Sequence, residues 1–137
     1  MEMILGAVAD AANKAVGDKL NILGIFHAIF SPTFPVTHPH LALALEFRAA
    51  PFEKGQTFVI EIALRDPDGK AIFGMQGNLQ LSKESPTLSP IIPFDINIHN
   101  VNFPVPGNYR FEILINGSLK GEVPLELMQI CAEDEAT

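Results

Sequence analysis

The chain has 137 residues, of which 47% are hydrophobic and 18% are charged, and its formal net charge is −7. This length and composition exclude a disordered chain and predict one folded domain over residues 1–130, followed by an acidic tail over residues 131–137. The Lys and Arg residues are scattered in an acidic chain, so we expect neither nucleic acid nor a membrane as a direct partner.

The N-terminal third predicts two strands, Met3–Ala12 and Leu20–Phe30, that are apolar on both faces and are joined by a polar turn around Asp18. Two-sided burial requires either a covering layer or a second subunit. One face of the second strand would carry the interface candidates Leu23, Ile25, His27 and Ile29. A short Ala-rich helix over Ala9–Val16 is the alternative. Charges such as Asp10 and Lys14 interrupt this apolar stretch, which argues against a signal peptide or a membrane span. We therefore expect a cytoplasmic protein.

Period-two alternation predicts further strands in the middle of the chain. Apolar residues alternate from Leu41 to Phe47 and again from Phe58 to Leu64. The second run meets Asp66-Pro67-Asp68-Gly69, a sequence typical of a hairpin turn. The returning strand, Phe73 to Leu81, contains Gly77, at which we expect a bulge or a close approach.

The C-terminal half repeats the same pattern. Strands are predicted from Ile92 to Ile98 and from Tyr109 to Ile115, and Asn116-Gly117 then predicts a tight hairpin. Pro124 in the last strand suggests that this strand lies at a sheet edge. Two proline-rich segments look like crossovers between sheets: Ser31–Pro39 and Ser85–Pro93. Together these features predict an all-β fold, an antiparallel β-sandwich of about eight strands that is immunoglobulin-like in the broad sense.

Two histidines and a glutamate form the pattern in this sequence that most resembles a metal-binding site. His38 and His40 lie two residues apart, so in a strand they share a face, and Glu46 has the same parity. Two imidazoles and a carboxylate can hold a metal ion, but the spacing to Glu46 is longer than in cupin barrels and no third histidine follows Pro106-Gly107. Two polar residues at the start of a strand are therefore the preferred interpretation, and the metal site remains the alternative.

A second polar group comprises Asp95, Asn97 and His99, which alternate along one strand face. Such a ladder suits the rim of a binding surface, although a solvated outer face also explains it. No Gly-x-Ser-x-Gly motif or glycine-rich phosphate loop is present, and the only cysteine, Cys131, has no base near it in sequence. We therefore expect no enzyme activity and no cofactor.

Several short motifs are shared with a known group of sequences. They include Gly17-Asp18-Lys19-Leu20-Asn21, Leu64-Arg65-Asp66-Pro67-Asp68-Gly69 and Pro106-Gly107-Asn108-Tyr109-Arg110-Phe111. With these, the chain resembles a family of small bacterial proteins catalogued as a domain of unknown function. The resemblance implies a β-sandwich in a bacterial cytoplasm and supplies no activity or site residue.

Two hypotheses for the function follow from these residues. The leading hypothesis is a non-enzymatic protein-interaction or assembly module that binds a protein partner or a second copy through the N-terminal hairpin, Met3 to Phe30. The alternative is a small-molecule or metal-binding β-domain that uses His38 and His40.

Overall fold

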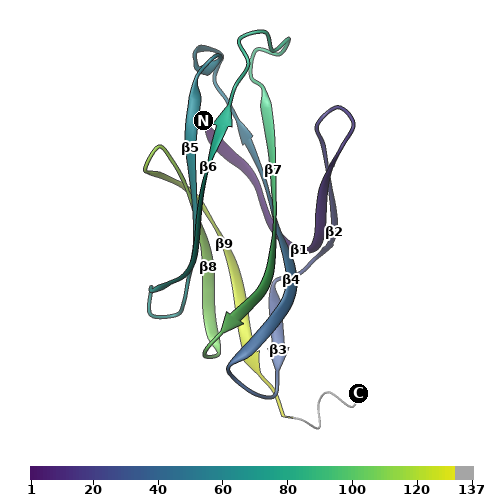
Figure 1. Cartoon of the computed structure of the whole chain (residues 1–137), viewed down its shortest axis with the longest axis vertical. Coiled ribbons are helices and arrows are strands. Elements are labelled where there is room, and N and C mark those ends of the chain that lie inside the picture. The colour runs from purple at the N-terminus through teal and green to yellow at the C-terminus, as the bar shows by residue number, and fades with distance from the viewer. Residues whose placement is uncertain (132–137) are drawn as a thin grey trace.

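The computed structural model describes residues 1–131 and contains nine strands there, with one 3-10 turn at Pro51–Glu53 (Figure 1). The strands are β1 (Glu2–Ala15), β2 (Lys19–Ile25), β3 (Ala28–Ser31), β4 (Val36–Arg48), β5 (Thr57–Arg65), β6 (Ala71–Gln80), β7 (Ile91–Phe103), β8 (Gly107–Ile115) and β9 (Ser118–Gln129). The all-β prediction is confirmed. Of the predicted acidic tail, residues 132–137 lie outside the described residues. Residues 1–131 contain no helix with the length and hydropathy needed to cross a membrane.

The strands form two sheets. One has the order β2-β1-β4-β7 and the other the order β3-β9-β8-β5-β6. Every pair is antiparallel except β3 with β9, which is parallel, so the prediction of a purely antiparallel fold is wrong at that edge. The reason is that the chain passes from one sheet to the other between two successive residues. The Phe26 amide donates to the carbonyl of Val8 in β1, whereas the His27 carbonyl accepts from the amide of Glu126 in β9. The chain thus reaches β9 running in the same direction.

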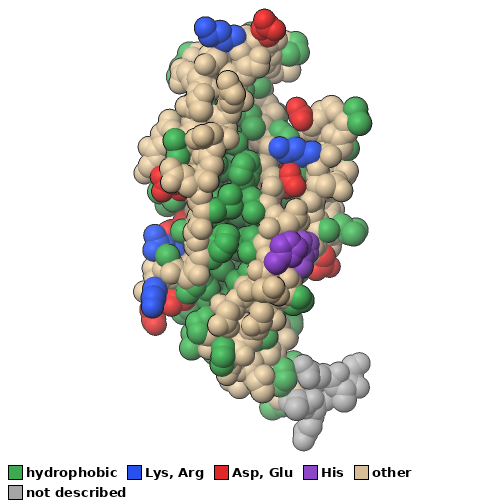
Figure 2. Space-filling view, viewed as in Figure 1, with side chains coloured by type: hydrophobic (Ala, Val, Ile, Leu, Met, Phe, Trp, Pro, Cys, Tyr) green, Lys and Arg blue, Asp and Glu red, His purple; other side chains and the backbone are tan. Residues whose placement is uncertain are grey.

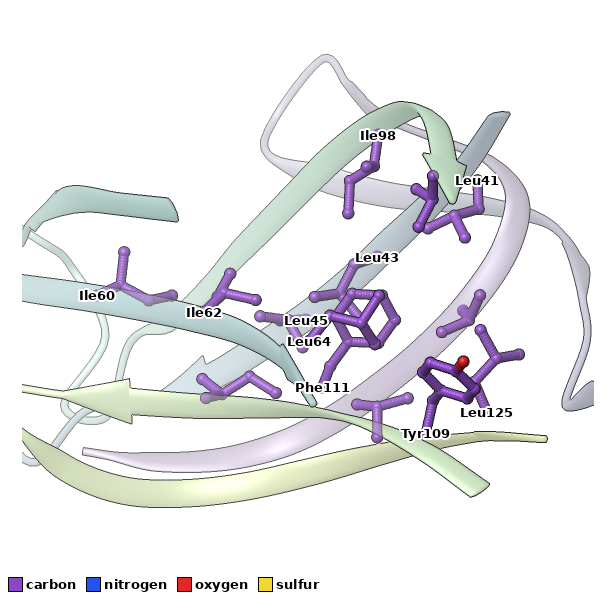
Figure 3. Close-up of a cluster of buried hydrophobic side chains, with 14 of the residues drawn as sticks. Leu41, Leu43, Leu45, Ile60, Ile62, Leu64, Ile98, Tyr109, Phe111 and Leu125 are labelled. Atoms are coloured by element: carbon purple, nitrogen blue, oxygen red, sulfur yellow. The ribbon is translucent and has the colours of Figure 1, made fainter. Parts of the chain in front are cut away.

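The inner faces of the two sheets enclose one hydrophobic core. Alternate residues of β4, β5 and β8 point into it and are almost completely buried, as Figure 3 shows for Leu43, Ile62 and Phe111 among others. Alternation puts every second side chain on the same face of a strand, so the period seen in the sequence maps directly onto this core. Burial of these apolar side chains is the main stabilising contribution to the fold.

Both predicted hairpin turns are confirmed. The Asp66 carboxylate accepts hydrogen bonds from the amides of Asp68 and Lys70, at 3.0 and 2.8 Å, and thereby holds the β5–β6 turn. In the β8–β9 turn, Asn116 and Gly117 both have positive φ, at 50° and 80°, as a two-residue type I′ turn requires. The proline-rich segments also connect the two sheets, between β3 and β4 and between β6 and β7.

Two local predictions from special residues are wrong. Pro124 does not mark an edge strand, because β9 lies between β3 and β8. The short β3 pairs only with residues from Glu126 onward, so the backbone beside Pro124 needs no donor on that side. Gly77 forms no bulge either, because it pairs in regular register with Ile60.

The N-terminal hairpin packs one of its faces against the outer side of β4. The far half of β1 leaves β4 after Ala9 and continues with β2, so the alternative of a helix over Ala9–Val16 is wrong. A second, small apolar cluster then forms between the hairpin and β4, from Ala12, Leu20, Ile22, Ala42 and Ala44. One face of the apolar N-terminal strands is therefore covered by the chain itself, whereas Leu23 and Ile25 on the other face of β2 stay exposed.

Candidate functional site

Four strands lie at the edges of the two sheets in the described part of the chain, and three of them carry features that discourage further pairing. β3 has only four residues. β2 carries Lys19 and a positive-φ Gly24, and β7 carries Pro93 and Asp95. Short length, charge and proline are the usual devices that protect a sheet edge. The fourth edge, β6, differs from these three.

β6 is a long and uncharged edge strand. Its ten residues, AIFGMQGNLQ, contain no Asp, Glu, Lys, Arg or Pro. It pairs with β5 in unbroken register from Phe73 to Gln80, with one irregularity near Ala71. The other side of this ladder has no partner strand in residues 1–131. Backbone groups along that side are free to pair with another extended chain.

Between β6 and β7, apolar side chains that pack on the core are partly exposed to solvent. β6 and β7 are edges of different sheets, and Figure 2 shows a stripe of hydrophobic side chains along the face where Figure 1 places these two strands. The half-buried apolar residues that these strands pack against the core are Ile72, Phe73, Met75, Ile92, Phe94 and Ile96. We call this surface the β6–β7 seam. One end of the seam opens into a cavity of about 230 Å³ lined by residues of both strands, including Gln80 and Ile92.

Gly77 leaves a notch on the inner face of β6. Phe73, Met75 and Leu79 share that face with Gly77 and carry large side chains. Apart from the two chain neighbours of Gly77, the only described atom that a Cβ at this position would contact is Cγ2 of Ile60, at 3.8 Å. The notch can therefore accept an apolar side chain from outside.

The structure separates the four predicted interface residues. Leu23 and Ile25 are 72% and 52% exposed on the outer face of β2. His27 is exposed in the crossover, whereas Ile29 is buried in the core at β3. Because the crossover divides the predicted strand between two sheets, these four side chains do not share one face. Leu23 and Ile25 remain an exposed apolar pair, and nothing in the structure indicates what covers them.

The predicted polar ladder and one predicted metal residue lie together. Asp95, Asn97 and His99 project from the outer face of β7, opposite Ala44, Ala42 and His40 of β4. The His40 ring nitrogen Nε2 is 3.2 Å from the side-chain oxygen of Asn97. The His40 and His99 rings have centroids 4.8 Å apart. Cross-strand pairing of β4 with β7 thus joins two groups that are 57 residues apart in sequence.

His38 is in a different environment. Its ring lies 5.8 Å from that of Phe26, and burial lowers the pKa of its imidazole, partly opposed by the hydrogen bond with His40 and by the charge of Asp10. Glu46 pairs with Pro93, farther along the same strand. Within residues 1–131, no three His, Cys, Asp or Glu side chains are grouped as a metal would require. The structure therefore does not assemble the alternative site of His38, His40 and Glu46.

Two arginines on the five-stranded sheet, Arg65 and Arg110, lie against carboxylates. Arg65 donates to Glu112 at 2.8 Å, and Arg110 lies 3.5 Å from the same carboxylate. The hydrogen bond and charge of Arg65, together with Arg110, hold the pKa of Glu112 below its usual range against the opposing effect of burial. These ion pairs neutralise the outer face of β5 and β8.

The model of a family of unknown function, DUF6941, matches residues 5–128. This match confirms the resemblance that the short motifs indicated. No curated protein matches the chain.

One similar solved structure is the alkylpurine DNA glycosylase AlkC of Pseudomonas fluorescens, bound to DNA containing an abasic site analog. It is 13% identical, with a TM-score of 0.48, and the similarity covers 89% of this chain but only 30% of the glycosylase chain. The exclusion of nucleic acid made from the sequence is withdrawn, because a structure similar to this chain is bound to DNA. The likeness does not show that this chain binds DNA.

Sequence reasoning missed β6 as a site, although a signal was present. The segment Ala71–Gln80 has no charged residue in a chain that is 18% charged. Which strands become edges depends on long-range pairing, so the missing charges acquire a meaning only once the strand order is known.

Proposed function

This chain belongs to the DUF6941 family of unknown function, and since the family supplies no activity, we propose one from the structure: a non-enzymatic module that binds an extended polypeptide strand along β6. The observation that carries the proposal is the free, uncharged edge of β6 beside a half-buried apolar seam. Backbone groups of β6 would pair with the incoming strand, and its alternate apolar side chains would enter the seam.

The exposed backbone determines the kind of partner. A flat apolar patch such as that of Leu23 and Ile25 can be covered by many shapes, whereas the row of N–H and C=O groups along a free strand edge can be paired in register by another extended chain. The notch at Gly77 adds a position where one side chain of that partner can be recognised. The proposed interaction surface is therefore β6, and no longer the N-terminal hairpin, Met3 to Phe30.

Within the same proposal, the domain over residues 1–130 is a β-sandwich, immunoglobulin-like in the broad sense. Support comes from Tyr109, whose hydroxyl donates to the carbonyl of Val105 at 2.7 Å, four residues upstream. It also accepts from the Val105 amide at 3.3 Å. A buried tyrosine that bonds back to the backbone a few residues upstream is the tyrosine corner of such sandwiches.

A peptide-binding experiment tests the proposed function. The probe is a fluorescent twelve-residue peptide that alternates valine and threonine and ends in lysine on both sides, followed by anisotropy. We expect saturable binding to the full chain. Gly77→Val should fill the notch and weaken binding by about tenfold, since one buried apolar side chain contributes roughly 1.5–3 kcal/mol.

The matched control is Gly74→Val, which adds the same side chain to the same strand but on the outer face of the sheet. Apart from its chain neighbours, the only described residue that a Cβ there would meet is Ile62, through its carbonyl oxygen at 3.9 Å. We expect Gly74→Val to bind the peptide as the natural chain does. Absence of saturable binding to the natural chain at concentrations at which it is monomeric, or equal loss in both variants, would contradict the proposal.

A further inference from the structure

We propose that the strand bound by β6 is β6 of a second copy, paired antiparallel around a two-fold axis at Gln76. This inference rests on the proposed function and names its partner. The two five-stranded sheets would then join edge to edge into one continuous sheet, and the two seams would lie side by side on its inner face.

Charge favours this partner. Each copy carries a formal net charge of −7, so most surfaces of two copies repel one another. β6 contributes no charged side chain to such a contact. Its outward residues after Gly74 are Gln76, Asn78 and Gln80, whose amides both donate and accept hydrogen bonds. The side-chain amide of one copy can therefore hydrogen-bond to the same amide of the second copy across a two-fold axis. Two carboxylates or two ammonium groups cannot do this.

Side-chain size excludes a register in which the two Gly77 residues face each other, and we place the axis at Gln76. In antiparallel pairing, residues directly opposite each other lie on the same face, so the inner residues of one β6 must oppose inner residues of the other. With Gln76 opposite Gln76 of the second copy, Met75 faces the second copy's Gly77 and Phe73 faces its Leu79. Each methionine then fills the notch left by a glycine. Moving the axis to Gly77 would place two notches opposite each other and leave them empty.

Disulfide trapping tests both the partner and the register. All variants carry Cys131→Ser, because the natural cysteine is exposed and would form competing cross-links. Directly opposite residues of paired antiparallel strands have Cβ atoms about 4.5–5.5 Å apart, close enough for a disulfide after small adjustment. Under mild oxidation with oxidised glutathione, we expect Gln76→Cys to give a covalent dimer.

Asn78→Cys is the matched control on the same face and the same strand. In the proposed register, position 78 lies opposite Gly74 of the second copy, so the two introduced thiols of an Asn78→Cys dimer are roughly 13 Å apart, too far for a disulfide. We expect Asn78→Cys alone to cross-link about tenfold more slowly than Gln76→Cys, since only the latter gains effective concentration from the paired strands. A mixture of Asn78→Cys with Gly74→Cys should cross-link as efficiently as Gln76→Cys.

Sedimentation equilibrium of the natural chain completes the test, with a concentration-dependent monomer–dimer equilibrium expected. A strict monomer at all concentrations, or cross-linking of Asn78→Cys as fast as Gln76→Cys, would overturn pairing with a second copy. If the chain is monomeric but still binds the valine–threonine peptide, only the choice of partner is wrong. If it is monomeric and does not bind the peptide, the proposed function is wrong as well.

Discussion

Gly77 lies directly opposite Ile60 in the β5–β6 ladder, and Cγ2 of Ile60 would be 3.8 Å from a methyl group on that glycine. The methyl group would be in ordinary van der Waals contact and in an extended strand, where glycine costs about 0.5–1 kcal/mol relative to alanine. We therefore expect Gly77→Ala to raise the free energy of unfolding by about that amount, measured by urea denaturation.

Gly107→Ala is the contrasting variant. Gly107 has a φ of 142°, and a Cβ there would lie 2.6 Å from Cγ of Pro67. Backbone strain and the clash should both lower the free energy of unfolding, by about 1–3 kcal/mol. For the first variant, a lower free energy of unfolding of Gly77→Ala would contradict the expected gain and would show that the inner face of β6 is already filled.

The ion pair of Arg65 with Glu112 predicts a dependence of stability on pH. The pKa of Glu112 is below its ordinary value of 4.5, because Arg65 donates a hydrogen bond to the carboxylate. The folded state thus binds this proton less tightly than the unfolded state. The stabilisation is complete above pH 4.5 and is lost as the pH falls through the lowered pKa.

Glu112→Gln should therefore lower the free energy of unfolding by about 0.5–1 kcal/mol at pH 7 and make little difference well below pH 4. The comparison is Glu122→Gln, because Glu122 is more exposed and lies 3.8 Å from Arg110. We expect a smaller change for Glu122→Gln in the same urea titrations. Equal effects of the two substitutions at pH 7 would contradict the role given to Arg65.

His38 predicts a pH effect closer to neutrality. Burial lowers the pKa of its imidazole below the ordinary 6.5, so the unfolded state binds the proton more readily than the folded state. Stability should decline as the pH falls below 6.5 toward the lowered pKa. His38→Gln should reduce this decline between about pH 7 and pH 5, measured by urea denaturation at each pH. Parallel pH profiles for the natural chain and His38→Gln would count against this explanation.

The Tyr109 hydroxyl predicts a large effect of removing one oxygen atom. Tyr109 is 1% exposed and satisfies both backbone groups of Val105. Tyr109→Phe retains the aromatic packing on Phe103, where the ring centroids are 5.1 Å apart, but leaves those groups without this partner. We expect a loss of about 1–3 kcal/mol in the free energy of unfolding, measured by urea denaturation. A change below about 0.5 kcal/mol would show that water replaces the hydroxyl.

Local chemistry explains why much of the fold could be predicted. The turns at Asp66–Gly69 and Asn116-Gly117 depend on residues within four positions of one another, so their sequence is sufficient. Alternation from Leu41 to Phe47 also maps directly onto the core. The crossover at Phe26 and His27 was missed because both flanking strands are apolar, and only their separate partners, β1 and β9, distinguish them.

The candidate site was less predictable, because it depends on strand order. His40 and Asn97 are joined only by the pairing of β4 with β7. Likewise, the apolar N-terminal hairpin suggested an interface, but Ala42 and Ala44 of the same chain cover one of its faces. The exposure of β6 follows from the absence of a neighbouring strand among residues 1–131, and no residue of β6 itself encodes that absence.

Amide hydrogen exchange tests the central claim most directly. The exchange of β6 amides would be followed by mass spectrometry in the full chain, with and without the valine–threonine peptide, and β2 would serve as the comparison because it is also an edge strand. The peptide should slow exchange in residues 73–80 and leave exchange in residues 19–25 unchanged. Unchanged exchange along β6 at saturating peptide, or protection centred on β2, would contradict strand binding at this edge.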